Sequence, residues 1–289
     1  MGIPSRVTVI GLGATGLPIA SRLADRDFAV TGVEINPHRR ATALANGLTL
    51  AELPAAADAD AVILQVTNAE QVSALLADGL AQSMPEGSTL LLMSTVGPEP
   101  ARRFADQATA AGIPLVDVPF TGGIDRARAG ELNLFAAGDP ADLERVRPVL
   151  AALGNAVECG SEVGDGQSFK LVNQLLTSVH ICAAAEALAL AEALGLDPAK
   201  AFDAVVDGAG RSWLLADRGP RMLQGDHAPM VSSLAIFIKD SALVAEAADQ
   251  AGLDARLVTA AAEIYARAAA LGLADADDSQ VIRAYQEDR

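Results

Sequence analysis

A lysine at position 170 is the residue whose type and surroundings most favour proton-transfer chemistry. It lies in the stretch GQSFKLVNQ, at the start of a long apolar segment, and Asn173 follows three positions later. If this segment is a helix, Lys170 and Asn173 share one face. Burial lowers the pKa of a lysine, so a lysine in a shielded cleft can exchange a proton with a hydroxyl group. The alternative is that Lys170 extends from an apolar helix into solvent and has no catalytic role.

A glycine-rich stretch near the N-terminus, VTVIGLGATGLPIA, has the spacing G-x-G-x-x-G. The first glycine permits a tight turn after a strand, the second lets the backbone approach a pyrophosphate, and the third lets the helix pack on the strand. The free N–H groups at the start of the helix then face the phosphates. The alternative is a tight turn without a ligand. We predict a dinucleotide site formed by Gly11, Leu12, Gly13, Ala14, Thr15 and Gly16.

An acidic residue, Glu34, ends the next expected strand, 18 residues after the last glycine of the loop. A carboxylate at this point accepts hydrogen bonds from both ribose hydroxyls of the adenosine and repels a 2′-phosphate, which favours NAD over NADP. Arg39 and Arg40 point the other way, because a guanidinium near the ribose can bind a 2′-phosphate. We interpret both arginines as solvated or stacked near the adenine. The cofactor contacts predicted beside Glu34 are Ile35 and Asn36.

Several expected strands end in small or polar residues. In a doubly wound parallel sheet, ligands bind beyond the carboxyl ends of the strands, so we place the active cleft along this edge. The side chains predicted to meet the cofactor there are Val66, Thr67, Asn68 and Thr95, and Ser94 is predicted to meet the substrate.

The first half of the chain alternates short apolar segments with amphipathic ones. The expected strands span 6–13, 28–35, 61–67, 89–95, 114–120 and 131–138, and the expected helices span 17–26, 38–47, 69–82 and 98–112. This alternation is typical of an α/β fold. We therefore predict an N-terminal Rossmann domain with a doubly wound parallel sheet.

After about residue 160 the pattern becomes helical throughout. Helical periodicity without proline covers 166–195, and further helices are expected over 198–210, 232–252 and 256–272. We predict a dinucleotide-binding domain at 1–163 and an all-helical substrate and oligomerisation domain at 164–289, joined through the long helix.

The composition excludes several classes of function. The 289 residues are 51% hydrophobic and carry a formal net charge of −16, which disfavours binding to nucleic acid or to an anionic membrane surface. The two cysteines and three histidines have no metal-ligand spacing, so we expect no metal site. The sequence has no charged leader and no unbroken apolar run of about 18 residues, so we expect a cytoplasmic protein that spans no membrane.

Five motifs occur in order along nearly the whole chain: GLGATG, STVGP, DVPFTGG, GDGQSFKLVNQ and FIKD. Together they resemble the β-hydroxyacid dehydrogenase family, which includes 3-hydroxyisobutyrate dehydrogenase and tartronate semialdehyde reductase. The resemblance implies a Rossmann domain followed by a helical domain that forms a homodimer or homotetramer. It also implies an enzyme that interconverts a small hydroxy acid and a carbonyl acid with NAD(P).

The resemblance further implies roles for residues at matching positions. Lys170 matches the catalytic lysine, and Asn173 matches a substrate-binding asparagine. Thr121 begins the loop that holds the substrate carboxylate, where the family has serine, and Lys239 matches a second lysine near the cofactor. The substrate contacts expected overall are Ser94, Thr121, Gly122, Gly123, Asn173, Lys239 and Trp213.

Longer stretches, among them NQLLTSVHICAAAEALALA and AIFIKDSALV, look most like the L-threonate dehydrogenase branch of this family. Members of that branch oxidise the C2 hydroxyl of a four-carbon sugar acid. Asn173 is a departure, because the branch often has histidine there while asparagine is the more general family residue. The segment GRSW at 210–213 is expected in the substrate pocket or its lid, and a core role for Trp213 stays open.

These features predict NAD-dependent oxidation of a small hydroxy acid such as L-threonate, with Lys170 as general acid and base. Within the family, the alternatives are a 3-hydroxyisobutyrate dehydrogenase and a semialdehyde or glyoxylate reductase. Outside it, they are an NADP-dependent imine reductase and a non-catalytic NAD-binding protein. Lys170 and Glu34 disfavour the imine reductase, and the combination of Lys170, Asn173 and Lys239 disfavours a protein without catalysis.

Overall fold

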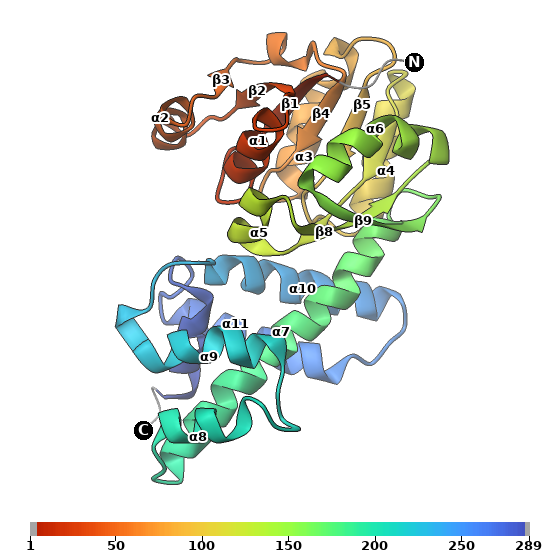
Figure 1. The fold of residues 1–289 in the computed structure, drawn as a ribbon. Coiled ribbons are helices and arrows are strands. Elements are labelled where there is room, and N and C mark those ends of the chain that lie inside the picture. Colours follow the sequence, from red (N-terminus) through yellow and green to blue (C-terminus); the bar gives the residue numbers. More distant parts are fainter. Residues whose placement is uncertain (1–4, 287–289) are drawn as a thin grey trace. The chain divides into compact units, whose positions relative to one another are not determined.

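A computed structural model of the chain describes residues 5–286, apart from the side chain of residue 56. The chain divides into two compact units, Met1–Lys170 and Leu171–Arg289. Both this division and the predicted boundary after residue 163 fall close to the start of the long helix α7, Asp165–Ala193 (Figure 1). The two units are described separately.

A nine-stranded sheet forms the centre of the first unit, in the order β3-β2-β1-β4-β5-β6-β8-β7, with β9 paired to β8. Neighbouring strands from β3 to β6 are parallel, whereas β8 runs antiparallel to β6 and to β7. The strands are β1 (Arg6–Ile10), β2 (Ala29–Val33), β3 (Thr49–Leu50), β4 (Ala61–Leu64), β5 (Thr89–Leu92), β6 (Leu115–Asp117), β7 (Phe120–Thr121), β8 (Leu132–Ala137) and β9 (Gly154–Gly160). The chain order reverses between β1 and β4, which makes the carboxyl ends of these two strands the expected ligand position.

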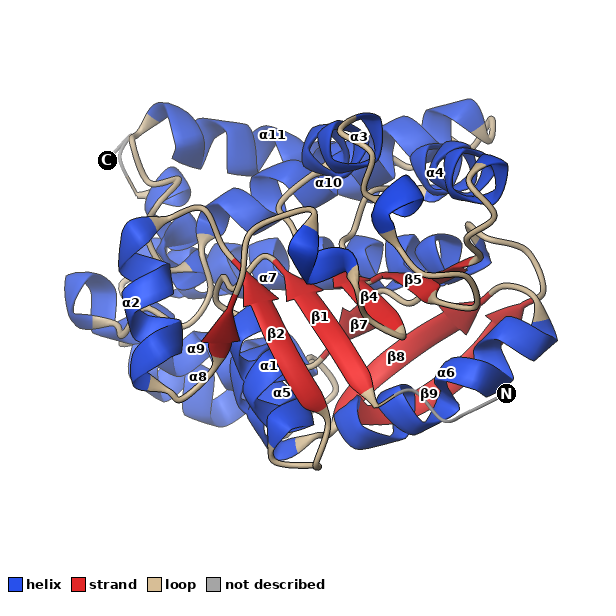
Figure 2. Ribbon diagram, turned by 90° about the horizontal axis from the view of Figure 1, so that it is seen from above, coloured by secondary structure: helices blue, strands red, loops and turns tan. Residues whose placement is uncertain are grey.

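Both faces of this sheet are buried. Along β4, Ala61 and Ile63 belong to one hydrophobic core while Val62 and Leu64 belong to another, because successive side chains of a strand point to opposite faces. Helices α1, α5 and α6 cover the first face, and α3 and α4 cover the second (Figure 2). The helices of this unit are α1 (Gly16–Ala24), α2 (Pro37–Ala45), α3 (Ala69–Ala77), α4 (Pro98–Ala110), α5 (Gly123–Ala129) and α6 (Pro140–Leu153), with short 3₁₀ turns η1 (Ala55–Ala57) and η2 (Ala81–Ser83).

Helices form the second unit. They are the greater part of α7, then α8 (Pro198–Val205), α9 (Trp213–Gln224), α10 (Leu234–Gln250) and α11 (Arg256–Ala270), with 3₁₀ segments η3 (Gly225–His227) and η4 (Asp278–Tyr285). Ile181 of α7, Leu214 of α9, Phe237 of α10, Tyr265 of α11 and Val281 of η4 meet in one hydrophobic core. The predicted fold class, a Rossmann sheet followed by a helical domain, is confirmed.

Helix α7 is long and apolar enough to pass a length and composition test for a membrane span, although we expected none. Half of the apolar window is buried inside the protein, and the core helix of a folded domain passes the same test. The buried residues Ile181, Ala185 and Leu188 in this window belong to the core of the second unit. The burial therefore favours α7 as a core helix.

Candidate active site

The glycine loop makes a turn that only glycine fits. Gly11 follows β1 with a φ of +92°, and a Cβ atom on it would lie 2.3 Å from the backbone oxygen of Gln65. A Cβ atom on Gly16 would lie 1.9 Å from the backbone oxygen of Gly11. Any side chain at either position would collide with backbone. The loop thus brings bare backbone to the carboxyl end of β1 and the first turn of α1, as a bound pyrophosphate requires.

Glu34 lies beside this loop and is buried. The Leu12 backbone N–H donates to Glu34 Oε2 at 3.0 Å, and the Asn36 N–H donates to Oε1 at 2.8 Å. The carboxylate is therefore held at the end of β2 by two main-chain donors. The neighbouring Ile35 is 88% exposed, and Asn36 uses its side chain to cap α2.

The two arginines near Glu34 lie in helix α2, and both reach back toward it. Arg40 Nη1 donates to the Glu34 backbone oxygen at 2.9 Å and pairs with Glu52 at 2.8 Å. Arg39 Nη1 lies 4.0 Å from Glu34 Oε2, and 3.7 Å from the point that a Cβ atom on Gly13 would occupy. The Arg39 guanidinium thus lies over the glycine loop.

Side chains at the ends of β4 and β5 hold the loops that follow. Ser94 Oγ accepts a hydrogen bond from the Val66 N–H at 2.8 Å and lies 2.9 Å from the Val66 carbonyl oxygen. Asn68 caps α3 by accepting from the Gln71 N–H, and the Gln71 side chain accepts from the Thr67 N–H. In this structure the Ser94 hydroxyl is bound to the end of β4. The ligand contacts expected of Ser94, Thr67 and Asn68 stay predictions.

Lys170 meets the predicted carboxylate loop. Its side chain is buried, and Nζ donates to the Phe120 carbonyl oxygen at 2.8 Å. Phe120 directly precedes Thr121, and the loop continues through Gly122 at φ +131° and Gly123 at φ +69°. A Cβ atom on Gly123 would meet nothing within 4 Å, so the backbone there borders open space. The first unit therefore brings Lys170 and residues 121–123 together.

A buried polar pair that the sequence analysis missed anchors the start of α7. Asp117, at the end of β6, accepts from the Gln167 N–H at 2.8 Å, from Gln167 Nε2 at 2.8 Å and from the Gly164 N–H at 3.1 Å. Gln167 Oε1 in turn accepts from the N–H groups of Val96 and Gly97. Both side chains are fully buried. The pair ties the first turn of α7, and so Lys170, to β6 and to the loop after β5.

Burial raises the pKa of Asp117 from 3.8 to about 6, and the hydrogen bonds from Gln167 and Gly164 oppose that rise. The only sequence signals for the pair were its places in the quoted motifs DVPFTGG and GDGQSFKLVNQ. No spacing rule could indicate that these two motifs meet.

In the second unit, Asn173 and Lys239 are joined by two further residues that the sequence analysis did not select. Asn173 Nδ2 donates to Gln174 Oε1 at 2.8 Å, and Gln174 Nε2 donates to Asp240 Oδ2 at 2.6 Å. Lys239 Nζ lies 2.6 Å from Asp240 Oδ1. The ordinary ion pair with Asp240 therefore exists, and it belongs to a larger polar network.

Trp213 is the first residue of α9, after the N-cap Ser212, and its side chain is mostly exposed. The Arg218 Cζ atom lies 5.7 Å from the centroid of its ring, within cation–π range. Arg218 also pairs with the buried Asp278 at 2.8 Å. Trp213 is thus not a core residue, and its expected place in the substrate pocket or lid stays a prediction.

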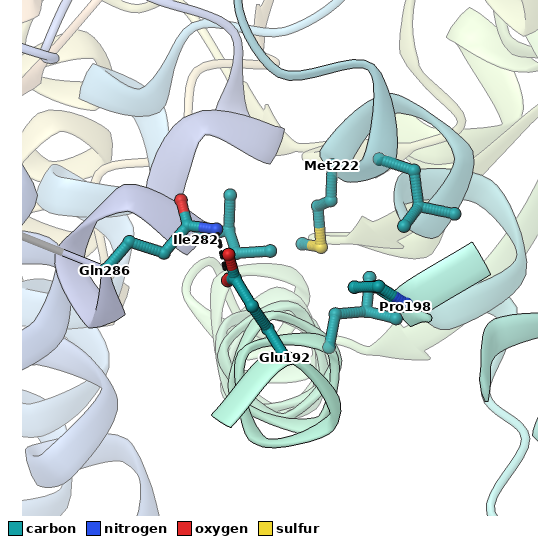
Figure 3. Close-up of a pocket in the computed structure, with 7 residues that line it drawn as sticks. Glu192, Pro198, Met222, Ile282 and Gln286 are labelled. Carbon is teal, nitrogen blue, oxygen red and sulfur yellow. Dashed lines mark hydrogen bonds between the residues drawn. The ribbon is translucent and has the colours of Figure 1, made fainter. Parts of the chain in front are cut away.

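A cavity of about 120 Å³ in the second unit contains none of the predicted site residues (Figure 3). It is lined by Leu188, Glu192, Pro198, Met222, Leu223, Ile282 and Gln286, and Gln286 Nε2 donates to Glu192 Oε2 across it at 3.1 Å. Among residues 5–286, no group of three or more His, Cys, Asp or Glu side chains is arranged to bind a metal ion.

Comparison with known proteins identifies the family. A family model for the NAD binding domain of 6-phosphogluconate dehydrogenase matches residues 6–161. A model for the NAD-binding of NADP-dependent 3-hydroxyisobutyrate dehydrogenase matches residues 164–285. L-threonate dehydrogenase of Cupriavidus necator is 35% identical over 96% of this chain and 95% of its own.

Two solved structures are similar over nearly their full length. A 3-hydroxyisobutyrate dehydrogenase from Salmonella typhimurium is 34% identical, with a TM-score of 0.89 over 96% of this chain and 99% of its own. The Mycobacterium tuberculosis 3-hydroxyisobutyrate dehydrogenase, solved with L-serine, is 31% identical, with a TM-score of 0.85 over 96% of this chain and 98% of its own. The chain therefore belongs to the β-hydroxyacid dehydrogenase family, the 3-hydroxyisobutyrate dehydrogenase-like enzymes, and is an NAD(P)-dependent oxidoreductase of hydroxy acids.

Proposed function

We propose that this enzyme oxidises the C2 hydroxyl of a short sugar acid such as L-threonate to the 2-keto acid, with NAD as cofactor. The observation that carries the proposal is the contact between Lys170 Nζ and the Phe120 carbonyl, directly before the Thr121–Gly123 loop. A proton-transfer group and a backbone loop open to a ligand thus lie next to each other. The relatives named L-threonate dehydrogenase support the choice of substrate.

The glycine loop and Glu34 fit the two ends of an adenosine diphosphate group. Bare backbone at Gly11–Gly16 leaves room for the pyrophosphate, and the Glu34 carboxylate would accept hydrogen bonds from the ribose hydroxyls. The exposed Ile35 offers an apolar surface to an adenine ring. We infer NAD as the preferred cofactor, because a 2′-phosphate would have to approach the buried carboxylate.

The proposed reaction needs three things from the chain. The backbone N–H groups of residues 121–123 bind the substrate carboxylate, and Asn173 helps to orient the hydroxyl. Neutral Lys170 accepts the hydroxyl proton at Nζ during oxidation, and its ammonium returns a proton in the reverse direction. The Phe120 carbonyl keeps Nζ at the loop in either direction, because it accepts a hydrogen bond from the amine or the ammonium. The bound nicotinamide supplies the hydride acceptor.

A substrate panel tests the proposal. NADH formation is measured with NAD and L-threonate, D-erythronate, D-glycerate, 3-hydroxyisobutyrate and 3-hydroxypropionate, and each reaction is repeated with NADP. We expect the highest kcat/KM with a four-carbon sugar acid and NAD. Activity restricted to 3-hydroxy acids would keep the family and overturn the substrate, and preference for NADP would overturn the role given to Glu34.

We also propose that the enzyme is a cytoplasmic homodimer or homotetramer. Four leucine and valine side chains on α7 of the second unit are half or more exposed and fall on one side of the helix: Val172, Leu176, Leu190 and Leu194. An apolar stripe of this length is typical of a surface that another subunit covers.

A further inference from the structure

A line of polar contacts in the second unit leads from Asn173 to Lys239 through two buried residues. Gln174 is 4% exposed and Asp240 is 2% exposed. Gln174 uses both ends of its amide: Oε1 accepts from Asn173 Nδ2 at 2.8 Å, and Nε2 donates to Asp240 Oδ2 at 2.6 Å. The second oxygen of Asp240 lies 2.6 Å from Lys239 Nζ. Each side chain in this line is therefore held by its neighbours.

The chemistry of these groups gives the line a direction. An ionised carboxylate can only accept hydrogen bonds, and the ammonium of Lys239 favours the ionised form of Asp240. Gln174 must therefore turn Nε2 to Asp240, which leaves its Oε1 facing Asn173. That oxygen is an acceptor, so Asn173 must offer its NH₂ group in return.

A second neighbour imposes the same orientation on Asn173. The Thr177 hydroxyl donates its hydrogen to the Asn173 backbone oxygen at 2.8 Å. Its oxygen is then free to accept, and Asn173 Nδ2 lies 3.2 Å from it. A flipped Asn173 amide would set its oxygen against two acceptors. Among residues 5–286, no hydrogen bond reaches the other amide atom, Asn173 Oδ1.

We propose that Gln174 and Asp240 are positioning residues that fix the Asn173 amide with its oxygen toward the ligand. The ligand group that Asn173 meets is then a hydrogen-bond donor, which means the hydroxyl of a hydroxy acid and not a carboxylate or keto oxygen. The inference rests on the proposed function for the presence of a hydroxy acid at Asn173. It adds a specificity: this side chain distinguishes the alcohol from molecules that lack the hydroxyl.

Binding to the NADH-loaded enzyme tests the specificity, because that complex cannot oxidise the alcohol. The two ligands are L-threonate and 3,4-dihydroxybutanoate, in which hydrogen replaces the C2 hydroxyl. One hydrogen bond to a neutral acceptor corresponds to about a tenfold difference in Kd. We expect the wild type to bind L-threonate about tenfold more tightly, and the Gln174→Met variant to lose most of this ratio.

Matched variants separate orientation from damage. Gln174→Met keeps the length of the side chain and leaves the Lys239–Asp240 pair in place. Asp240→Asn keeps the shape but can donate as well as accept, so it should lower the ratio less than Gln174→Met. Asp249→Asn removes a charge from the exposed end of α10 and should leave the ratio unchanged. An unchanged ratio in Gln174→Met would overturn the proposal.

A spectroscopic readout tests the orientation without any substrate. In protein labelled with ¹⁵N-asparagine, the side-chain NH₂ signal of Asn173 is the one that Asn173→Ser removes. We expect its hydrogens to exchange with water more slowly than those of the exposed Asn155, and we expect Gln174→Met to remove this protection. Equal exchange of Asn173 and Asn155 in the wild type would overturn the inward NH₂. If protection is present but no hydroxy acid is bound or oxidised, the proposed function fails and the orientation stands.

Discussion

Lys170 acts, in this account, through a nitrogen that the fold keeps at the carboxylate loop. Its contact with the Phe120 carbonyl places Nζ directly before Thr121, and the side chain is buried. A lysine with only a surface role would have no reason to be held there. Its chemical role and its position are therefore testable separately.

We expect Lys170→Met to lower kcat by about 10²–10⁴, the usual contribution of a general acid or base. Methionine keeps the unbranched stem, so NADH binding should stay within about threefold of the wild type, and fluorescence titration with NADH checks this. Lys200→Met on α8 is the matched control, because Lys200 is exposed and lies outside the proposed site. Turnover near that of the wild type in Lys170→Met would refute the catalytic role.

Glu34 is the residue on which cofactor choice depends. Glu34→Gln removes the negative charge and keeps an acceptor for the Leu12 or Asn36 N–H, while Arg39 and Arg40 stay beside it. We expect the ratio of kcat/KM for NADP to that for NAD to rise by about 10–100-fold, as a removed charge repulsion of about 1.4–2.8 kcal/mol would give. Glu52→Gln, which alters an exposed partner of Arg40, is the control. A ratio that does not move would show that Glu34 does not face the ribose.

At the scale of elements, the start of α7 is the piece that determines where Lys170 lies. Asp117 and Gln167 connect its first turn to the end of β6 and to the loop after β5. Lys170 follows Gln167 by less than one helical turn, so movement of this turn moves the lysine. The anchor consists of buried polar groups, and its stability should therefore depend on pH.

Asp117 binds its proton more tightly in the folded chain than in the unfolded chain, because burial raises its pKa from 3.8 to about 6. Its contribution to stability is fully present below about pH 4 and declines as pH rises to about 6, by ~3 kcal/mol in total. We expect the free energy of unfolding of the wild type, relative to Asp117→Asn, to fall by this order between pH 4 and pH 7. Urea denaturation of both proteins measures it, with the exposed Asp106→Asn as control. A difference that is constant with pH would contradict the raised pKa.

Elements with a clear period were predictable, and those made by tertiary contacts were not. All six expected strand regions contain strands, because each has buried apolar residues of β-forming type. Strand β9 (Gly154–Gly160) was missed, since its side chains are largely exposed and it exists through pairing with β8. Helix α9 was missed because Gly219 and Pro220 interrupt its pattern, and α6 contains Pro148. The two-residue strands β3 and β7 are too short to give any period.

The same limit applies to the site. Lys170, Glu34 and the glycine loop carry their signal in local sequence, through residue type and spacing. Asp117–Gln167 and Gln174–Asp240 are pairs of residues 50 and 66 positions apart, and each member alone is an ordinary polar residue. Only the folded chain brings the partners together, so the residues that position the chemistry were not predictable from spacing.

At the scale of the whole molecule, the proposed oligomer depends on the apolar stripe of α7. Leu176→Glu introduces a charge in its middle, and we expect that variant to elute as a monomer while the wild type elutes as a dimer or tetramer. Light scattering coupled to gel filtration gives both masses. Leu44→Glu, at an exposed leucine of α2, is the control for surface charge. A wild-type monomer, or a variant with unchanged mass, would contradict the proposed interface.

The central claim is that Lys170 carries the oxidation of a hydroxy acid by NAD, and one measurement tests it most directly. NADH formation is followed with L-threonate and NAD for the wild type, Lys170→Met and Lys200→Met at equal protein concentration. The account predicts turnover in the wild type and in Lys200→Met, and a loss of about 10²–10⁴ in Lys170→Met with NADH binding retained. Equal turnover in all three proteins would contradict the role of Lys170, and an absence of turnover with every hydroxy acid of the panel would contradict the function itself.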